Sequence, residues 1–153
     1  MPDYTELKLE LYKLCEHYVR KRLETAQEAL SSTQESSNQE EKSTAGDKHD
    51  TERAMMQIQV EQLTKQLAEA NKLAEELKRV DYVNKQTVVT QGAIVFTSQN
   101  NYFMSISAGK IKSNQGDFFA VSMTSPIAQA LKGKSANDEL IFNGKKIQIE
   151  AIF

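Results

Sequence analysis

Residues 56–77 read MQIQVEQLTKQLAEANKLAEEL, and the apolar residues in this stretch return alternately after four and three positions. The repeat is carried by Met56, Val60, Leu63, Leu67, Ala70, Ala74 and Leu77. This alternation places the apolar side chains on one seam of an α-helix, as in a coiled coil. We therefore predict one long helix from about Asp47 to Val80.

A helix of matching length is predicted over residues 3–30, where apolar residues again recur at helical spacing. Its stripe consists of Leu7, Leu11, Leu14, Tyr18, Leu23, Ala26 and Leu30. If the two helices pack antiparallel, one register sets Leu7 opposite Val80 and Leu30 opposite Met56. A parallel homodimer through the second helix is the competing arrangement, but the matched lengths favour an intramolecular hairpin.

The segment between the two helical patterns, residues 31–45, contains no large apolar residue. Such a segment has no apolar stripe to bury, although its Gln, Glu and Lys residues are adequate helix formers. We expect exposed helix ends on both sides of a short turn, and the register places the reversal near Ser43 and Thr44.

After Tyr82 the sequence changes to short β-prone runs separated by turn residues. Strands are predicted at residues 87–90, 93–96, 102–106 and 118–121, and a loop at residues 109–116. Ser125 and Pro126 begin a short helix, because Ser is a favoured N-cap and Pro is favoured at the first helical position. Asn143-Gly144 marks a closing hairpin that pairs Leu140 with Ile147.

These patterns predict an α+β chain with two parts. Residues 1–81 form an antiparallel coiled-coil finger with its tip at about residues 41–50. Residues 82–153 form a small antiparallel β domain with one short helix.

Composition narrows the possible functions. The 153 residues carry a formal net charge of −2, which argues against broad non-specific binding to nucleic acid. Cys15 is the only cysteine, so an internal disulfide is impossible and a cysteine-based zinc site is not expected. No signal peptide and no apolar run of membrane-spanning length is visible, so we expect a cytoplasmic protein without membrane contact.

The stretch Gly46-Asp47-Lys48-His49-Asp50 carries the candidate chemistry. Two acids at positions i and i+3 of a helix share one face and are able to act on one hydrated Mg²⁺. The same pattern also describes an N-cap and a capping box, in which both acids stabilise the start of the helix. The two interpretations are compatible.

The order of parts, together with two local motifs, resembles the bacterial Gre-type transcript cleavage factors. The first motif is Val121-Ser122-Met123-Thr124-Ser125-Pro126-Ile127-Ala128, followed by Leu131, Gly133-Lys134 and Asp138. The second is Gly46-Asp47-x-x-Asp50, similar to the Gly-Asp-x-x-Glu at the tip of the family finger. The resemblance implies that the second domain is FKBP-like.

The resemblance also implies a function. Gre-type factors insert their finger into the secondary channel of RNA polymerase, close to the 3′ end of the nascent RNA. Their tip acids, here Asp47 and Asp50, help to hold a Mg²⁺ ion of the polymerase, which then cleaves the backtracked transcript. The factor would act as a monomer, would have no cofactor of its own, and would be an accessory factor rather than a complete enzyme. Candidate polymerase contacts are Tyr102, Phe103, Ser125 and Pro126.

Two other functions are considered. Thr51-Glu52-Arg53-Ala54 stands where the family has Asn-Ala-Glu-Tyr, which leaves open a regulator that binds polymerase without promoting cleavage. An FKBP-like domain also suggests a prolyl isomerase, but the chain has no Trp for the base of such a pocket. Nucleophilic catalysis by Cys15 is rejected, because a coiled coil offers it no pocket.

Overall fold

The computed structural model describes residues 2–41 and 47–153, and side chains in the range 37–49 lie outside that description. The chain divides into two compact units. The β unit comprises residues 1–18 and 73–153, and the hairpin unit comprises residues 19–72. This division differs from the predicted boundary after residue 81. The start of the first long helix, up to residue 18, and the end of the second, from residue 73, group with the sheet.

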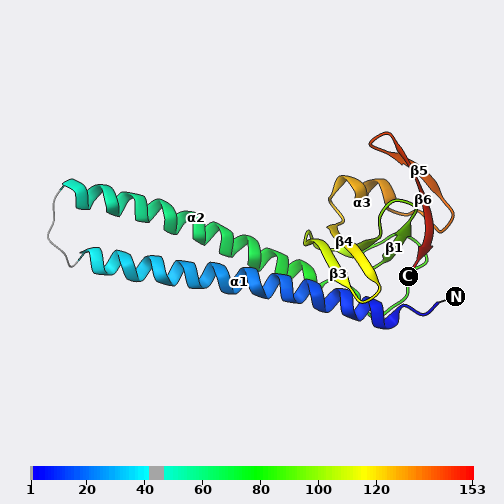
Figure 1. Cartoon of the computed structure of the whole chain (residues 1–153), viewed down its shortest axis with the longest axis horizontal. Coiled ribbons are helices and arrows are strands. Elements are labelled where there is room, and N and C mark those ends of the chain that lie inside the picture. The colour runs from blue at the N-terminus through cyan, green and yellow to red at the C-terminus, as the bar shows by residue number, and fades with distance from the viewer. Residues whose placement is uncertain (1, 42–46) are drawn as a thin grey trace. The chain divides into compact units, whose positions relative to one another are not determined.

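Two long helices contribute to the hairpin unit, α1 (Thr5–Glu41) and α2 (Asp47–Lys78) (Figure 1). The predicted seam of α2 is confirmed: Met56, Val60, Leu63 and Leu67 are half-buried and Ala70 is fully buried, between exposed neighbours. On α1, Ala26 is likewise buried. Lys21 and Gln66 line one small hollow, which agrees with the predicted antiparallel register.

As far as Glu41, the polar segment continues as helix, as the sequence predicts. Helix α1 runs on to Glu41, and the Thr33 hydroxyl donates a hydrogen bond to the main-chain oxygen of Ala29 at 2.8 Å. The Thr33 side chain is buried, and this bond satisfies its hydroxyl donor there. The predicted reversal at Ser43 and Thr44 lies outside the described residues.

A six-stranded sheet forms the centre of the β unit, in the order β3-β4-β2-β1-β6-β5 (Figure 1). The strands are β1 (Ile94–Thr97), β2 (Tyr102–Ser105), β3 (Gly109–Ser113), β4 (Gly116–Ser122), β5 (Glu139–Phe142) and β6 (Lys145–Ile152). The sheet is mixed, because β2 and β4 pair in parallel. The chain reverses twice between them, and β4 then inserts between β2 and β3.

Both faces of the sheet are covered at strand β2, where every residue is buried. Tyr102 and Met104 face the cluster that contains Ala128 and Leu131 of the short helix α3 (Pro126–Leu131). On β2, Ser105 lies 3.7 Å from the Cys15 sulfur of α1. All four residues of β2 are therefore buried, which explains its run of three large, mainly apolar residues before Ser105.

Several sequence predictions for the β unit are confirmed. The closing hairpin pairs Leu140 with Ile147 across the Asn143-Gly144 turn. Ser125 is the N-cap of α3, and its side chain accepts a hydrogen bond from the Ala128 amide. The α+β class is confirmed as well.

Three predictions for the β unit need correction. The predicted antiparallel sheet is mixed, because β2 and β4 pair in parallel. The predicted loop at residues 109–116 is instead strand β3 and the start of β4, because Ile111 is buried between exposed lysines and pairs with Phe118. The predicted strand at residues 87–90 is reduced to one isolated bridge between Val88 and Ser135.

No helix in the described part of the chain is long and apolar enough to cross a membrane.

Candidate functional site

The first turn of α2 holds the two candidate acids. The helix begins at Asp47, so Asp47 and Asp50 are three residues apart on one helix, as predicted. The side chain of Asp50 is exposed. Gly46 and the side chain of Asp47 lie outside the described residues, so the convergence of the two carboxylates stays a prediction.

Asp47 and Asp50 by themselves do not make a complete metal site. Among the described residues there is no group of three or more His, Cys, Asp or Glu side chains able to hold a metal ion. Two aspartates fall short of the six oxygen ligands that Mg²⁺ requires. A Mg²⁺ ion held by Asp47 and Asp50 would therefore need further oxygen ligands.

Exposed apolar residues follow the acids along α2, and the sequence analysis did not single them out. Met55 is 66% exposed and Ile58 is 56% exposed, whereas the seam residues Met56 and Val60 are half-buried. Met55 and Ile58 are three residues apart, so they share one face of α2 outside the seam. The signal was available, since both are apolar residues at positions that the seam does not explain.

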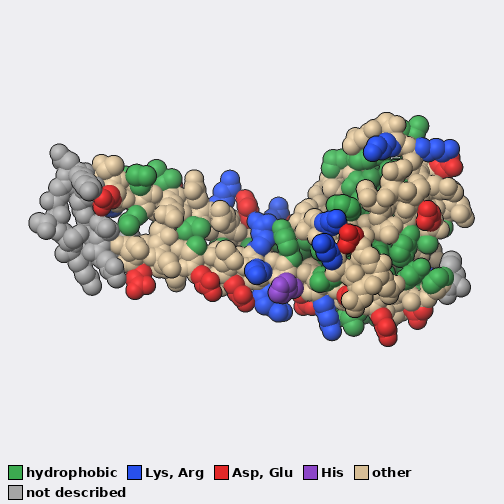
Figure 2. Space-filling view, viewed as in Figure 1, with side chains coloured by type: hydrophobic (Ala, Val, Ile, Leu, Met, Phe, Trp, Pro, Cys, Tyr) green, Lys and Arg blue, Asp and Glu red, His purple; other side chains and the backbone are tan. Residues whose placement is uncertain are grey.

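Basic side chains mark another part of the hairpin unit. Lys21 and Arg22 of α1 line a hollow of about 160 Å³ together with Gln66 of α2. Figure 2 shows Lys and Arg side chains gathered on this part of the helix pair. Both Lys21 and Arg22 are exposed, so the cluster presents positive charge to solvent.

The two predicted polymerase contacts on β2, Phe103 and Tyr102, have little or no exposed surface. Phe103 has no exposed surface, because it lies on a central strand and the sheet is covered on both faces. It belongs to the core and cannot contact a partner. Tyr102 is only 7% exposed, and its ring centre lies 6.2 Å from that of Phe119.

Ser125 and Pro126 are placed at the start of α3. The Ser125 hydroxyl donates a hydrogen bond to the main-chain oxygen of Ser122 at 2.8 Å, so this side chain shapes the turn as well as capping the helix. Pro126 is exposed at the first helical position, where its missing amide hydrogen costs nothing.

Tyr102 and Pro126 meet at a shallow, mainly apolar hollow of about 340 Å³, which we call the β4–α3 hollow. It is lined by Asn100, Tyr102, Phe119, Val121, Pro126, Ile127 and Phe142. The sequence analysis identified two of these residues and missed the aromatic side chains of Phe119 and Phe142. Phe142 precedes the Asn-Gly turn, and its position in a hairpin strand was the available signal.

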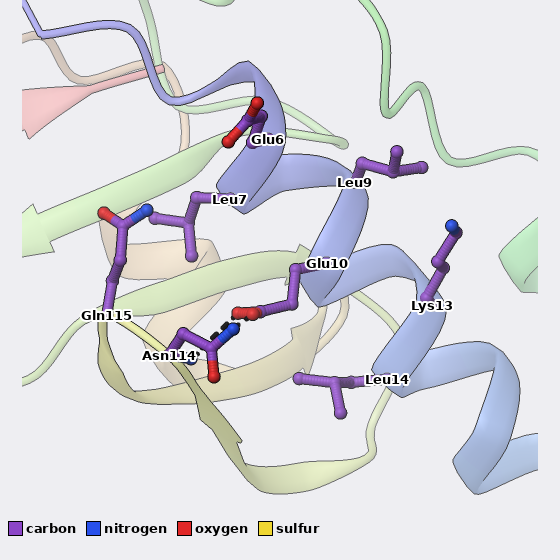
Figure 3. A pocket seen from close by; sticks show the side chains of 8 residues that line it. All are labelled: Glu6, Leu7, Leu9, Glu10, Lys13, Leu14, Asn114 and Gln115. Atoms are coloured by element: carbon purple, nitrogen blue, oxygen red, sulfur yellow. Dashed lines mark hydrogen bonds between the residues drawn. The ribbon is translucent and has the colours of Figure 1, made fainter.

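A larger hollow, of about 560 Å³, lies beside the first turns of α1 (Figure 3). One side is formed by Asn114 and Gln115, in the turn between β3 and β4. The main-chain amide of Asn114 donates hydrogen bonds to the two carboxylate oxygens of Glu10, at 2.8 Å and 3.2 Å. These bonds tie the helix to the turn. None of the predicted site residues lines this hollow.

Lys8 is a buried cation that the sequence analysis missed. Its side chain has no exposed surface, and its ammonium donates hydrogen bonds to the main-chain oxygens of Asn84, at 2.8 Å, and Phe153, at 2.6 Å. The ammonium also lies 5.3 Å from the centre of the Phe153 ring. Burial lowers the pKa of Lys8 to about 8, although the nearby Asp81 carboxylate acts in the opposite direction.

The buried Lys8 predicts a pH dependence of stability. Its pKa is about 8 in the folded chain, against 10.5 for a fully solvated lysine, so between these values the unfolded chain holds more protons. The free energy of unfolding should therefore rise with pH across this window, by about 3 kcal/mol for this group. Urea unfolding of wild type and Lys8→Met at several pH values measures the effect as the difference between the two proteins. A difference that stays constant with pH would contradict the prediction.

Compared with family models, curated proteins and solved structures, the chain matches none of them.

Proposed function

We propose that this chain is a Gre-like accessory factor of RNA polymerase that stimulates cleavage of backtracked transcripts. The proposal rests on the resemblance of its tip and C-terminal motifs to those of the Gre-type factors. It is supported by the antiparallel helical hairpin, whose second helix begins at Asp47 and presents an exposed Asp50. The start of α2 at this acid pair is the observation that carries the proposal.

The proposed chemistry is hydrolysis of a phosphodiester by two metal ions. One ion activates the attacking water and the other stabilises the oxygen that leaves. Asp47 and Asp50 would help to hold one hydrated Mg²⁺ in the active site of the polymerase, which supplies the remaining ligands. The factor would thus lend carboxylates to a site that the polymerase completes.

The β unit would anchor the factor outside the channel. Its β4–α3 hollow is apolar, and Tyr102, Ser125 and Pro126 lie in or beside it. We propose this hollow as the polymerase contact, without Phe103. Lys21 and Arg22 would attract RNA phosphates near the nascent 3′ end. One chain would act on each polymerase.

The tip acids provide the test of this function. We expect wild-type protein to shorten the transcript in stalled, backtracked elongation complexes. Replacing both Asp47 and Asp50 by Asn should lower the cleavage rate by about a hundredfold or more, because the second Mg²⁺ loses two ligands. Gel analysis of labelled transcripts measures the rate.

The control is Glu61→Gln with Glu69→Gln, which removes two exposed charges from the same helix away from its first turn. Its cleavage rate should equal that of wild type. Full cleavage by the double-aspartate variant would remove Asp47 and Asp50 from the mechanism. A wild-type chain that binds polymerase but leaves the transcript intact would favour the alternative, a non-cleaving regulator, to which Thr51-Glu52-Arg53-Ala54 already points.

A further inference from the structure

The turn between β5 and β6 consists of Asn143 and Gly144, the only Asn-Gly sequence in the chain. Phe142 pairs with Lys145 on either side of the turn, so the loop has just these two residues. Asn143 has a φ of 50° and Gly144 a φ of 75°, which are the left-handed conformations that a tight hairpin turn requires. Both residues are exposed to solvent.

The polar groups of this turn are not engaged elsewhere. Within the described part of the chain, neither the Asn143 side-chain amide nor the Gly144 main-chain amide makes a hydrogen bond. A Cβ added at Gly144 would meet nothing within 4 Å, so the space around the turn is open. The Asn143 side chain and the Gly144 nitrogen are therefore able to approach each other without giving up a hydrogen bond of their own.

We propose that Asn143 is a site of spontaneous covalent modification, in which the Gly144 nitrogen attacks its side chain. The nitrogen gives up its proton to water and bonds to Cγ of Asn143, which closes a five-membered succinimide ring. The bond from Cγ to Nδ2 breaks, and Nδ2 takes up a proton and leaves as ammonia. Asparagine is among the thermolabile residues of proteins, and this ring closure needs no reagent except water.

Water then opens the succinimide in one of two ways. Cleavage between the Gly144 nitrogen and Cγ leaves an aspartate at position 143 and restores the normal main chain. Cleavage between that nitrogen and the main-chain carbonyl carbon of position 143 leaves an isoaspartate, in which the chain continues through Cγ. Both products carry a carboxylate where Asn143 carried a neutral amide.

Two features of the turn favour the attack. Gly144 has no Cβ, so nothing on its own residue crowds the attacking nitrogen. Lys145 follows it and is exposed, and its positive charge favours loss of the amide proton.

Asn114 is the matched comparison within the same chain. It is exposed and lies in the other two-residue turn, between β3 and β4, where Ser113 pairs with Gly116. The residue after Asn114 is Gln115, whose side chain crowds the nitrogen. The Gln115 amide also donates a hydrogen bond to the Ser113 hydroxyl at 3.1 Å, whereas the Gly144 amide is free to react.

The modification would change the β5–β6 hairpin and its surroundings. It adds a negative charge next to Lys145, and isoaspartate also lengthens the main chain of a loop that has only two residues. Phe142, directly before the turn, lines the β4–α3 hollow, so the change occurs at the rim of that hollow. The chemistry is independent of the proposed function, and only an effect on polymerase binding would rest on it.

Peptide mapping by mass spectrometry tests the proposal on the full chain after incubation at mildly alkaline pH and physiological temperature. Asn143 should be converted at least about tenfold faster than Asn114, because only Asn143 is followed by glycine. Enzymatic methylation of isoaspartate should label the peptide that contains position 143. Gly144→Ala should slow the conversion of Asn143 by about tenfold or more, since the added Cβ crowds the nitrogen.

Two measurements keep the result tied to the folded turn. Circular dichroism checks that Gly144→Ala is folded, and a parallel incubation in urea gives the rate in the unfolded chain. Conversion of Asn143 only in urea would overturn the proposal, because the folded turn would then protect the residue. Equal rates at Asn143 and Asn114 would overturn it as well, and so would a folded Gly144→Ala chain that reacts as fast as wild type.

Discussion

Replacing Gly92 by alanine is expected to destabilise the β unit by about 3–5 kcal/mol. Gly92 adopts a φ of +93°, which L side chains rarely adopt, and an added Cβ would overlap the main-chain oxygen of Asp81. That oxygen is backbone and cannot turn away. The Gly92 amide also donates to the Met104 oxygen on β2 at 2.7 Å, so a shift that relieved the clash would strain the sheet. Urea unfolding monitored by circular dichroism measures the loss.

Gly144→Ala is the matched control for this prediction. Gly144 also has a positive φ, of 75°, but an added Cβ there would meet nothing within 4 Å. Its substitution should cost only about 1 kcal/mol, from backbone strain alone. Equal losses for the two variants would show that the approach of Gly92 to Asp81 does not limit the fold.

Replacing Lys8 by glutamate is expected to cost a similar amount, about 3–5 kcal/mol. The substitution would put a carboxylate, which only accepts hydrogen bonds, against the main-chain oxygens of Asn84 and Phe153. Both oxygens would lose a donor, and a buried negative charge would be left without a counter-ion. Chemical denaturation at neutral pH measures the change.

Lys13→Glu, the same change on an exposed face of α1, is the control. It should alter the unfolding free energy by less than about 0.5 kcal/mol, because water solvates either charge. If Lys8→Glu were as mild as Lys13→Glu, the ammonium of Lys8 would not be buried against the two main-chain oxygens in solution.

The long helices could be predicted from the sequence, whereas part of the sheet could not. The seam from Met56 to Leu77 was predictable because the repeat runs through many residues and each repeat supports the next. Strand β3 was missed because Gly109 and Gly116 suggested a loop, whereas they begin two paired strands. The alternation Lys110-Ile111-Lys112 was the strand signal, but it is short. The parallel pairing of β2 with β4 depends on where β4 inserts, which no local pattern encodes.

Among the candidate site residues, those set by local sequence were predictable and those set by long-range contacts were not. The start of α2 at Asp47 follows from local chemistry, because acids favour the first turn of a helix. The burial of Phe103 and Lys8 depends on helix α1 lying against the sheet, a long-range contact. A lysine beside Leu7 in an amphipathic helix suggests a solvated side chain, and only the positions of Asn84 and Phe153 supply the partners that make its burial tolerable.

The bond from Lys8 to Phe153 joins residues that are 145 positions apart in the chain. The turns of α1 form through local bonds and need nothing else, whereas their packing needs β6 and the residue that follows it. Contacts so distant in sequence are slow to form, and a ribosome makes Phe153 145 residues after Lys8. The apolar face of α1 around Leu7 and Leu11 therefore stays uncovered while most of the chain is being made. Until Phe153 has been made, this apolar face of the nascent chain is open to chaperones and to aggregation.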